Sequence, residues 1–453
     1  MNMKISNIKL TLIVVLFFTS LNGYAGAPKN IILMISDGCG FNHIDAASIF
    51  EHGKTGVQIY EQFPVKYGMT TYPVNGVGYD PELAWNDFND VKKKWTDSAA
   101  SATAMATGAK TYNGAIGVDS SKNELKNIVE RLEQRGKATG VVTTVQFSHA
   151  TPAAFVVHNE KRSHYSEIAR DMILNSQLEV IMGAGHPFYD KAGKLKSDSS
   201  FKYVGGKKVW LKLVNGTAGN DADGDGIVDP WILIEDRQAF QKLMNGAAPN
   251  RVIGIPKVAI TLQQERDGDK NADPFAVPFI ETVPTLEEMT RAALNVLDSD
   301  PDGFFIMIEG GAVDWASHNN QSGRMIEEEI GFNRAVEAVV NWVEQNSSWN
   351  ETLVIVTGDH ETGYLTGVDS GIQQDGKSVW NPIEKRGNDA LPGMEWHSGK
   401  HTNSLIPFFA KGVCSELFHR YADEIDPVRG KYLDNAEIGK ALFSMFKIIE
   451  RAQ

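Results

Sequence analysis

The sequence predicts an α/β fold: a three-layer sandwich with a mostly parallel central sheet and helices on both of its faces. Three observations lead to this prediction. Short apolar runs recur along the chain, helical patterns lie between them, and the alternation resumes after each irregular stretch. The chain has 453 residues, of which 42% are hydrophobic and 22% charged, so it is long enough to build one large core.

The expected strands are continuous apolar runs, which are typical of strands buried on both faces. They cover Asn30–Ser36, Ala138–Val145, Leu178–Met182, Phe304–Ile308, Leu353–Thr357 and Leu405–Ala410. The expected helices between them cover Glu124–Arg135, Leu286–Leu297 and Arg324–Gln345. The first two begin with the capping-box pattern, which is Ser121 with Glu124 and Thr285 with Glu288.

Three polar or aperiodic stretches interrupt this rhythm, near residues 72–94, 191–273 and 363–399. Because the strand pattern resumes after each of them, we interpret residues 26–453 as a single domain with insertions.

The first 25 residues have the pattern of a signal peptide. Lys4 and Lys9 accompany an apolar run, Leu10–Phe18, that is too short to span a bilayer, and Gly23-Tyr24-Ala25 suits a signal peptidase. We therefore expect residues 1–25 to be removed and the protein to be exported, to the periplasm or the extracellular space. The alternative is an N-terminal anchor; no other stretch predicts a membrane span.

The chain carries 44 basic and 57 acidic residues, a net charge of −13. This balance argues against nucleic-acid binding, which depends on Lys and Arg at the phosphate backbone. The two cysteines, Cys39 and Cys414, are distant in sequence, so their pairing stays open.

Three of the expected strands end in an acid. Asp37, Glu309 and Asp359 each follow a strand-like run. In open α/β sheets ligands bind beyond the carboxyl ends of the strands, so these acids are expected to meet at one edge. Clustered carboxylates repel one another unless they are protonated or bound to cations.

Imidazoles accompany these acids. Asp314 and His318 lie four residues apart and would share one face of a helical turn, His360 adjoins Asp359, and His401 precedes the last strand. Any one of these histidines alone suits a hydrogen-bonded turn, but imidazole combined with carboxylate is typical of Zn²⁺ sites. These acids and histidines together predict a metal centre.

A run of small residues, Thr96–Ala104, predicts a helix that begins near Asp97 and Ser98. A helix N-terminus offers free N–H groups to an oxyanion, and Ser98 there can act as a nucleophile if a metal lowers its pKa. Taken alone, either residue is better explained as a plain N-cap.

Together these segments resemble the alkaline phosphatase family. The nucleophile segment of that family is similar to Thr96–Ala104, Thr107-Gly108, Lys110–Asn113 and Ile116–Val118. Further segments occur in the family's order: those around Asp37, Thr151–Ala154, Glu309, Asp314, His318, Asp359–Gly363 and Gly399–His401. The resemblance extends from about Lys29 to Gly412, apart from the insertions.

The resemblance implies two Zn²⁺ ions and one Mg²⁺ ion. The first Zn²⁺ would take Asp314, His318 and His401; the second would take Asp37, Asp359 and His360, with Ser98 close by; the Mg²⁺ would take Asp37, Thr151 and Glu309. Arg162 stands at the family's offset from Thr151 and would clamp two phosphate oxygens.

Two positions depart from a well-studied enterobacterial relative, which has Asp where this chain has His149 and Lys where it has Trp315. His149 is expected to reach the Mg²⁺ through water, which a hydrated octahedral ion tolerates. These two departures are expected to affect the metal preference of the third site and the turnover rate.

The resemblance therefore implies hydrolysis of phosphate monoesters through a phosphoserine on Ser98, which releases inorganic phosphate and an alcohol, with an alkaline optimum. The alternatives are a phosphodiesterase of the same superfamily or a non-catalytic protein that binds zinc or phosphate. The family is mostly dimeric, so a homodimer is expected, with 363–399 at the place of its interfacial crown insertion.

The segment Asp221–Asp229 matches the first nine positions of an EF-hand-type loop. Its acids are Asp221, Asp223, Asp225 and Asp229, but the twelfth position is Ile232 in place of the usual Glu. The segment is either a Ca²⁺ site or a solvated acidic turn.

Overall fold

The structure, a computed structural model, describes residues 26–222, 224–387 and 390–447. The expected signal peptide, residues 1–25, lies outside the described part of the chain. Among the described residues, no helix combines the length and the apolar composition needed to cross a bilayer.

One large sheet forms the middle of the molecule. Its strands are β1 (Asn30–Ser36), β2 (Val65–Thr70), β3 (Ala138–Gln146), β4 (Val180–Ala184), β7 (Ile232–Ile234), β8 (Val252–Gly254), β9 (Phe304–Gly310), β10 (Thr352–Gly358), β17 (Ile406–Gly412), β18 (Glu424–Asp426) and β19 (Gly430–Asp434). All six predicted strands are present, with ends shifted by at most two residues.

The 11 strands lie in the order β18-β19-β2-β17-β10-β1-β9-β3-β4-β8-β7. Every neighbouring pair from β10 to β7 is parallel, whereas β17 is antiparallel to β10 and β2, and β18 is antiparallel to β19. The predicted α/β class with a mostly parallel sheet is therefore confirmed.

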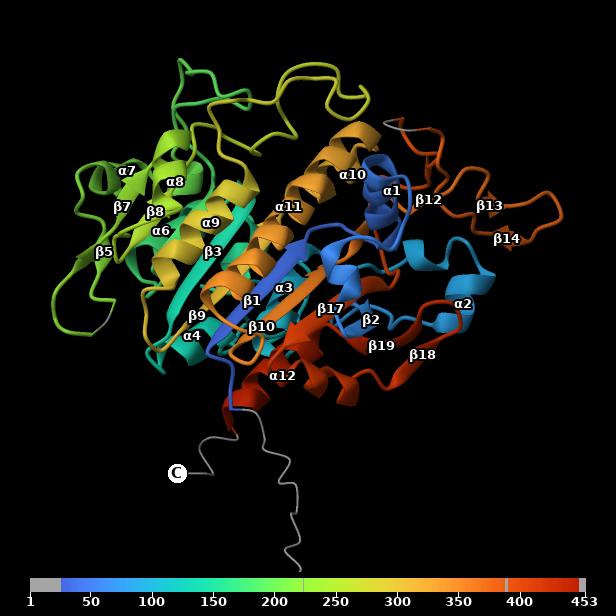
Figure 1. Ribbon diagram of the computed structural model, residues 1–453, viewed down its shortest axis with the longest axis horizontal. Coiled ribbons are helices and arrows are strands. Elements are labelled where there is room, and N and C mark those ends of the chain that lie inside the picture. The colour runs from blue at the N-terminus through green and yellow to red at the C-terminus, as the bar shows by residue number, and fades with distance from the viewer. Residues whose placement is uncertain (1–25, 223, 388–389, 448–453) are drawn as a thin grey trace, which may run out of the picture.

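Helices cover both faces of this sheet (Figure 1). One face carries α1 (Phe41–His52), α8 (Arg237–Leu243), α9 (Leu286–Leu297) and α11 (Ser322–Asn346), and the other carries α3 (Ser98–Thr107), α4 (Ile128–Glu133), α6 (Tyr165–Leu174), α7 (Lys207–Val214) and α12 (Ala436–Lys447). Within the described ranges, the short 3-10 helices are η1 (Ile59–Gln62), η2 (Asp90–Lys92), η3 (Lys202–Val204) and η4 (Ser415–Arg420).

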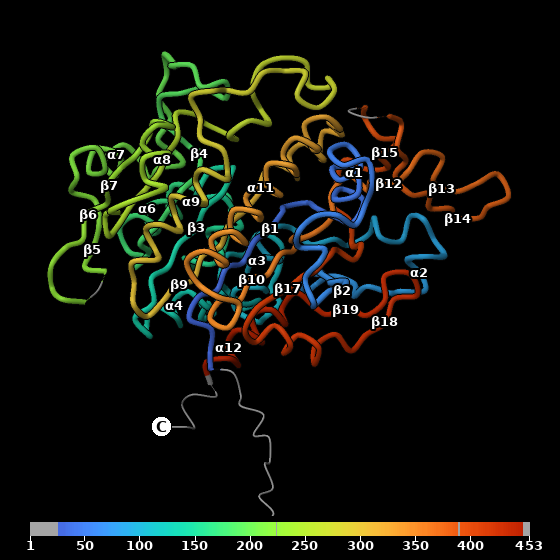
Figure 2. Tube along the Cα trace, in the orientation of Figure 1, coloured from blue at the N-terminus to red at the C-terminus, as the bar shows by residue number. Residues whose placement is uncertain are grey.

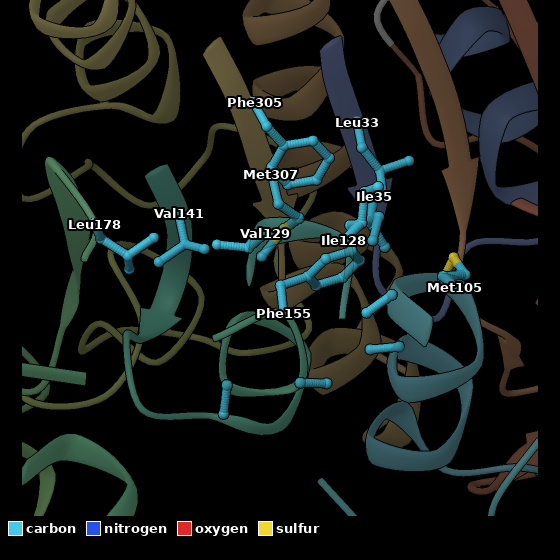
Figure 3. Close-up of a cluster of buried hydrophobic side chains, with 14 of the residues drawn as sticks. Leu33, Ile35, Met105, Ile128, Val129, Val141, Phe155, Leu178, Phe305 and Met307 are labelled. Carbon is cyan, nitrogen blue, oxygen red and sulfur yellow. The ribbon is translucent and has the colours of Figure 1, made fainter. Parts of the chain in front are cut away.

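The side chains of β1 alternate between the two cores. Ile31, Leu33 and Ile35 belong to one buried cluster, and Ile32 and Met34 to the other; all five are fully buried. Figure 3 shows part of the first cluster, where Leu33 and Ile35 lie beside Phe305 and Met307 of β9 and near Ile128 of α4. A strand that is apolar at every position is thus explained by two covered faces.

The two predicted capping boxes have different outcomes. Thr285 caps α9 as expected, because its hydroxyl accepts from the backbone N–H of Glu288 and the Glu288 carboxylate accepts from the N–H of Thr285. The Ser121 prediction is wrong. Glu124 pairs with Val118 in an isolated β-bridge, and α4 begins only at Ile128, with Asn127 and Glu130 forming the box.

The irregular stretches lie toward opposite ends of the molecule (Figure 2). Within 191–273, β5 (Gly219–Asn220) pairs with β6 (Asp229–Pro230), while β7 and β8 extend the central sheet. Within 363–399, β12 (Leu365–Thr366) pairs with β15 (Glu395–Trp396) and β13 (Gly371–Ile372) with β14 (Ser378–Val379).

The stretch 72–94 holds α2 (Pro81–Asn86) and packs against 363–399. Phe88 lies 4.8 Å from Tyr364 and 5.5 Å from Trp380 between ring centroids.

Cys39 is buried, Cys414 is half-buried, and both are free thiols.

Candidate active site

Three neighbouring strands deliver three acids to one edge of the sheet. Asp37 follows β1, Asp359 follows β10, and Glu309 is the penultimate residue of β9. Because β10, β1 and β9 are adjacent and parallel, their carboxyl ends coincide, with Ser36 in register with both Gly358 and Gly310. The three carboxylates are at most 1% exposed.

Shorter elements bring the other predicted residues to this edge. Thr151 lies in α5 (Ala150–Ala154), which follows β3, the next strand beyond β9. Asp314 and His318 lie on α10 (Ala312–His318), and His401 opens β16 (His401–Thr402), which pairs with β11 (Glu361–Thr362) just after His360. Residues far apart in sequence are thus gathered at one place.

The first ligand group consists of Asp314, His318 and His401. The Nδ1 atom of His318 lies 2.9 Å from the carbonyl of Gly399, and that of His401 lies 2.8 Å from the carbonyl of Thr96. If each Nδ1–H donates to its carbonyl, both Nε2 lone pairs are left unprotonated. These Nε2 atoms lie 3.0 Å apart, and each is 3.4 Å from Oδ1 of Asp314.

Two lone pairs that face each other beside a carboxylate repel unless a proton or a cation lies between them. The three ligand atoms lie within 4.8 Å of one another, so one ion can contact all of them. Imidazole nitrogen with carboxylate oxygen is a donor set that suits Zn²⁺.

The second ligand group consists of Asp37, Asp359 and His360, whose donor atoms also lie within 4.8 Å of one another. The Nε2 atom of His360 lies 3.1 Å from Oδ2 of Asp359 and 3.7 Å from Oδ1 of Asp37. The other oxygen of Asp359 is held by the backbone N–H groups of Gly38 and His360, which fixes the orientation of that carboxylate.

Several buried oxygens at this edge have no hydrogen-bond partner in the described structure. They are both carboxylate oxygens of Asp37, Oδ2 of Asp359, Oε1 of Glu309 and the hydroxyl of Thr151. Leaving buried polar atoms unpaired costs on the order of 1–3 kcal/mol each, more when they are charged. The donor atoms present therefore fit divalent cations, including a third one near Asp37, Thr151 and Glu309.

The pKa values of these carboxylates also indicate that the site suits divalent cations. Without a cation, burial and then the neighbouring carboxylates of Asp359 and Asp314 raise the pKa of Asp37 well above its ordinary value. Burial is also the main cause that raises the pKa of Asp359 to about 6 and that of Glu309 to about 7. A bound cation would remove this penalty by favouring the ionised forms.

Ser98 is the first residue of α3 and is almost fully buried. Asp97 caps the helix, since its carboxylate accepts from the N–H of Ala100 at 2.9 Å. The Ser98 hydroxyl lies 3.3 Å from Nε2 of His360, and Ser101 ties the helix to the carbonyl of Asp359 at 2.7 Å. The predicted nucleophile therefore lies against the second ligand group, at a helix N-terminus.

Arg162 faces the same space. Its Nη1 atom donates to Oδ2 of Asp97 at 3.0 Å. Burial alone would lower the pKa of Arg162, but the Asp97 carboxylate outweighs it and raises the pKa. A cleft of about 320 Å³ is lined by Ser98, His149, Arg162, Asp314, Trp315, His318, Asn319 and His401.

His149 and Trp315 form an aromatic wall of this cleft. Their ring centroids lie 5.8 Å apart, and Tyr165 stacks on His149 at 6.0 Å. Burial and then the charge of Arg162 lower the pKa of His149 to about 3, so the ring is neutral at physiological pH. Its Nδ1 atom is buried and accepts or donates no hydrogen bond within the described residues.

Sequence reasoning missed two hydroxyls that orient the candidate ligands. Thr362 donates to Oδ1 of Asp314 at 2.6 Å and lies 3.3 Å from Nδ1 of His360, and Thr143 donates to the Glu309 carboxylate. Such outer contacts commonly fix the geometry of metal ligands. Thr143 lies inside a buried strand, where its sequence context gives no signal beyond strand preference.

The acidic loop 221–229 lies outside this site. The Asp221 carboxylate accepts from the N–H groups of Gly224 and Gly226 at 2.8 and 2.9 Å, and Asp229 accepts from that of Ala222. Asp223 lies outside the described residues. Calcium binding by this loop stays a prediction.

An α/β sheet whose carboxyl edge gathers two groups of candidate metal ligands beside a serine is typical of metal-dependent hydrolases. The sequence model of the alkaline phosphatase family matches residues 28–394, and the chain belongs to that family.

The chain is 30% identical over 355 residues to alkaline phosphatase 3 of Bacillus subtilis, a match that covers 75% of this chain. It spans 63% of that relative's length and 64% of the length of the related alkaline phosphatase 4.

Two solved structures are similar over nearly their whole length. The alkaline phosphatase of the Antarctic bacterium TAB5 is 27% identical with a TM-score of 0.62, and covers 93% of this chain and 99% of its own. The cold-active alkaline phosphatase of a Shewanella species is 26% identical with a TM-score of 0.64, and covers 92% and 99%. A TAB5 variant with glutamate in place of a histidine was solved with Mg bound in its M3 site.

Proposed function

We propose that this protein hydrolyses phosphate monoesters through a covalent phosphoserine on Ser98. The observation that carries this proposal is the position of the Ser98 hydroxyl, 3.3 Å from Nε2 of His360 and in one cleft with Arg162. Membership in the alkaline phosphatase family supports the substrate class.

The proposed cofactors are two Zn²⁺ ions and one Mg²⁺ ion. Asp314, His318 and His401 would hold the first Zn²⁺, and Asp37, Asp359 and His360 the second. Asp37 would also hold the Mg²⁺, together with Thr151 and Glu309. When bound, the ions supply Lewis acidity and positive charge for the phosphoryl group and for the attacking and leaving oxygens.

Each residue of the site would have its own role in the two steps of the proposed hydrolysis. The hydroxyl of Ser98 passes its proton to solvent and attacks phosphorus in line with the ester oxygen. The bond from phosphorus to that oxygen breaks, and the oxygen takes a proton from solvent and departs as the alcohol. The N–H groups at the start of α3 and the guanidinium of Arg162 face the oxygens on which negative charge lies. Water then attacks the phosphoserine, releases inorganic phosphate and restores Ser98.

Charge balance favours this assignment. Asp37, Glu309, Asp314 and Asp359 contribute four negative charges when ionised, whereas three divalent cations contribute six positive charges. The surplus of about two suits a phosphate dianion. A non-catalytic phosphate-binding protein could use the same serine as a hydrogen-bond donor, so hydrolysis that is lost in Ser98→Ala separates the two functions.

A comparison of two substrates tests the proposed reaction against the diesterase alternative. We expect purified protein that contains zinc and magnesium by elemental analysis to hydrolyse p-nitrophenyl phosphate at least about 10²-fold faster than bis(p-nitrophenyl) phosphate, because Arg162 suits a terminal group with two free oxygens. Faster turnover of the diester would contradict the proposal.

Replacing Arg162 with alanine is expected to weaken inhibition by inorganic phosphate by about 10-fold to 100-fold, because two charge-assisted hydrogen bonds are lost. The metal content should be unchanged, because no candidate ligand is altered. Inhibition constants and elemental analysis of both proteins check this result.

Lys242→Ala, on α8 across the sheet, is the matched control, since it also removes a cation but one that does not line the cleft. Loss of zinc in the Arg162 variant would show that Arg162 belongs to the metal centre and not to phosphate binding.

Export and assembly complete the proposal. We propose that residues 1–25 direct the chain to the periplasm or the extracellular space, and that two chains form a homodimer in which 363–399 takes part. Mass spectrometry of the secreted protein and its mass in solution address these two points.

A further inference from the structure

A second hollow opens beside the cleft. It has a volume of about 560 Å³, and Arg162 lines both spaces. Apart from Gly114, every residue of its wall has a polar side chain; Asn75, Tyr112, Asn113 and Ser163 are among them. We call this hollow the polar groove. Its polar side chains suit a hydrophilic ligand.

Hydrogen bonds hold the walls of the polar groove in place. The N–H of Arg162 donates to the carbonyl of Gly114 at 2.8 Å, and the Tyr112 hydroxyl donates to the carbonyl of Glu160 at 3.0 Å. Asn113 accepts from the N–H of Asp97 at 3.0 Å. The groove is therefore fixed relative to the helix that presents Ser98.

The charges of the polar groove are mostly positive. Lys122, Lys161 and Arg162 line it against one carboxylate, Glu160. Glu160 pairs with Lys122 at 2.6 Å, and Arg162 pairs with Asp97. Lys161 is exposed and has no ion pair within the described residues. A chain with a net charge of −13 thus places an uncompensated cation next to its proposed phosphate clamp.

We propose that the polar groove receives the leaving alcohol of the substrate, and that Lys161 favours alcohols that carry a second negative charge, such as a second phosphate. The inference rests on the proposed function, which puts the scissile phosphate at Arg162. The next residue along the wall is Lys161, so the alcohol can extend from one cation to the other.

The matched probes are propane-1,3-diol monophosphate and its bisphosphate, which differ only in the second phosphate. The measured quantity is the ratio of initial kcat/KM for the bisphosphate to that for the monophosphate. Because an exposed charge is screened, Lys161→Ala is expected to lower this ratio by about threefold to fivefold. Glu160→Gln is expected to raise it, because it removes the only carboxylate of the groove.

Lys242→Ala is again the control and should leave the ratio unchanged. Added NaCl should lower the ratio for the wild type more than for Lys161→Ala. Both groove residues are exposed, so the variants are expected to fold. If neither groove variant changes the ratio of kcat/KM for the bisphosphate to that for the monophosphate, the inference is wrong. If the wild type hydrolyses neither probe, the proposed function itself is wrong.

Discussion

Ser98→Ala is expected to lower the turnover of phosphate monoesters by about 10³-fold or more, because no other group of the described site can take the place of its hydroxyl in a covalent step. The helix should persist, since Asp97 supplies the cap and alanine is the best helix former. Initial rates with p-nitrophenyl phosphate and elemental analysis of the two proteins measure the effect.

Acid quenching with a ³²P-labelled monoester gives a second readout. The wild type should retain label on Ser98, and the variant should retain none. Thr107→Ala, which removes a hydroxyl from the far end of α3, is the matched control and should keep nearly full activity. A variant at Ser98 that retains a tenth of the activity would show that water attacks the substrate directly.

Removal of divalent cations with a chelator is expected to abolish activity and to lower the melting temperature, and the drop should be larger at pH 8 than at pH 5.5. Four buried carboxylates then lack their counter-charge. Without a cation the pKa of Asp359 is raised to about 6, that of Glu309 to about 7, and that of Asp37 well above its ordinary value.

A raised pKa means that the folded protein binds the proton more tightly than the unfolded chain does. The stability it contributes is complete below the unfolded pKa, near 4, and is lost as the pH rises through 6 and 7. For Glu309 this loss is on the order of 3 kcal/mol. His360, whose pKa is lowered by burial, acts in the opposite direction, and Asp314 is ionised throughout this range.

Thermal melts of loaded and stripped protein at the two pH values measure the difference. Glu309→Gln should flatten the pH dependence of the stripped protein, because it removes one titrating carboxylate. Readdition of zinc and magnesium should restore the wild type. If the difference in melting temperature between loaded and stripped protein is the same at pH 8 and pH 5.5, the bound ions do not neutralise the charge of these carboxylates.

Local patterns were sufficient for much of the fold. Strand positions, the cap of α9 at Thr285 and the start of α3 at Asp97 depend on neighbours within a few residues, and the structure agrees with all three. The Ser121 prediction failed because residues 118–124 form a tight turn closed by the β-bridge of Glu124 with Val118, and this local structure competes with the capping pattern.

The sequence by itself determined that acids end several strands, that Asp314 and His318 share a helical turn and that Ser98 opens a helix, because each of these follows from spacing along the chain. Only the tertiary structure decided that β10, β1 and β9 are neighbours, that the Nε2 atoms of two distant histidines face each other, and that Lys161 lines the polar groove next to Arg162. Strand order and side-chain approach depend on packing between remote segments, and spacing along the chain carries no information about that packing.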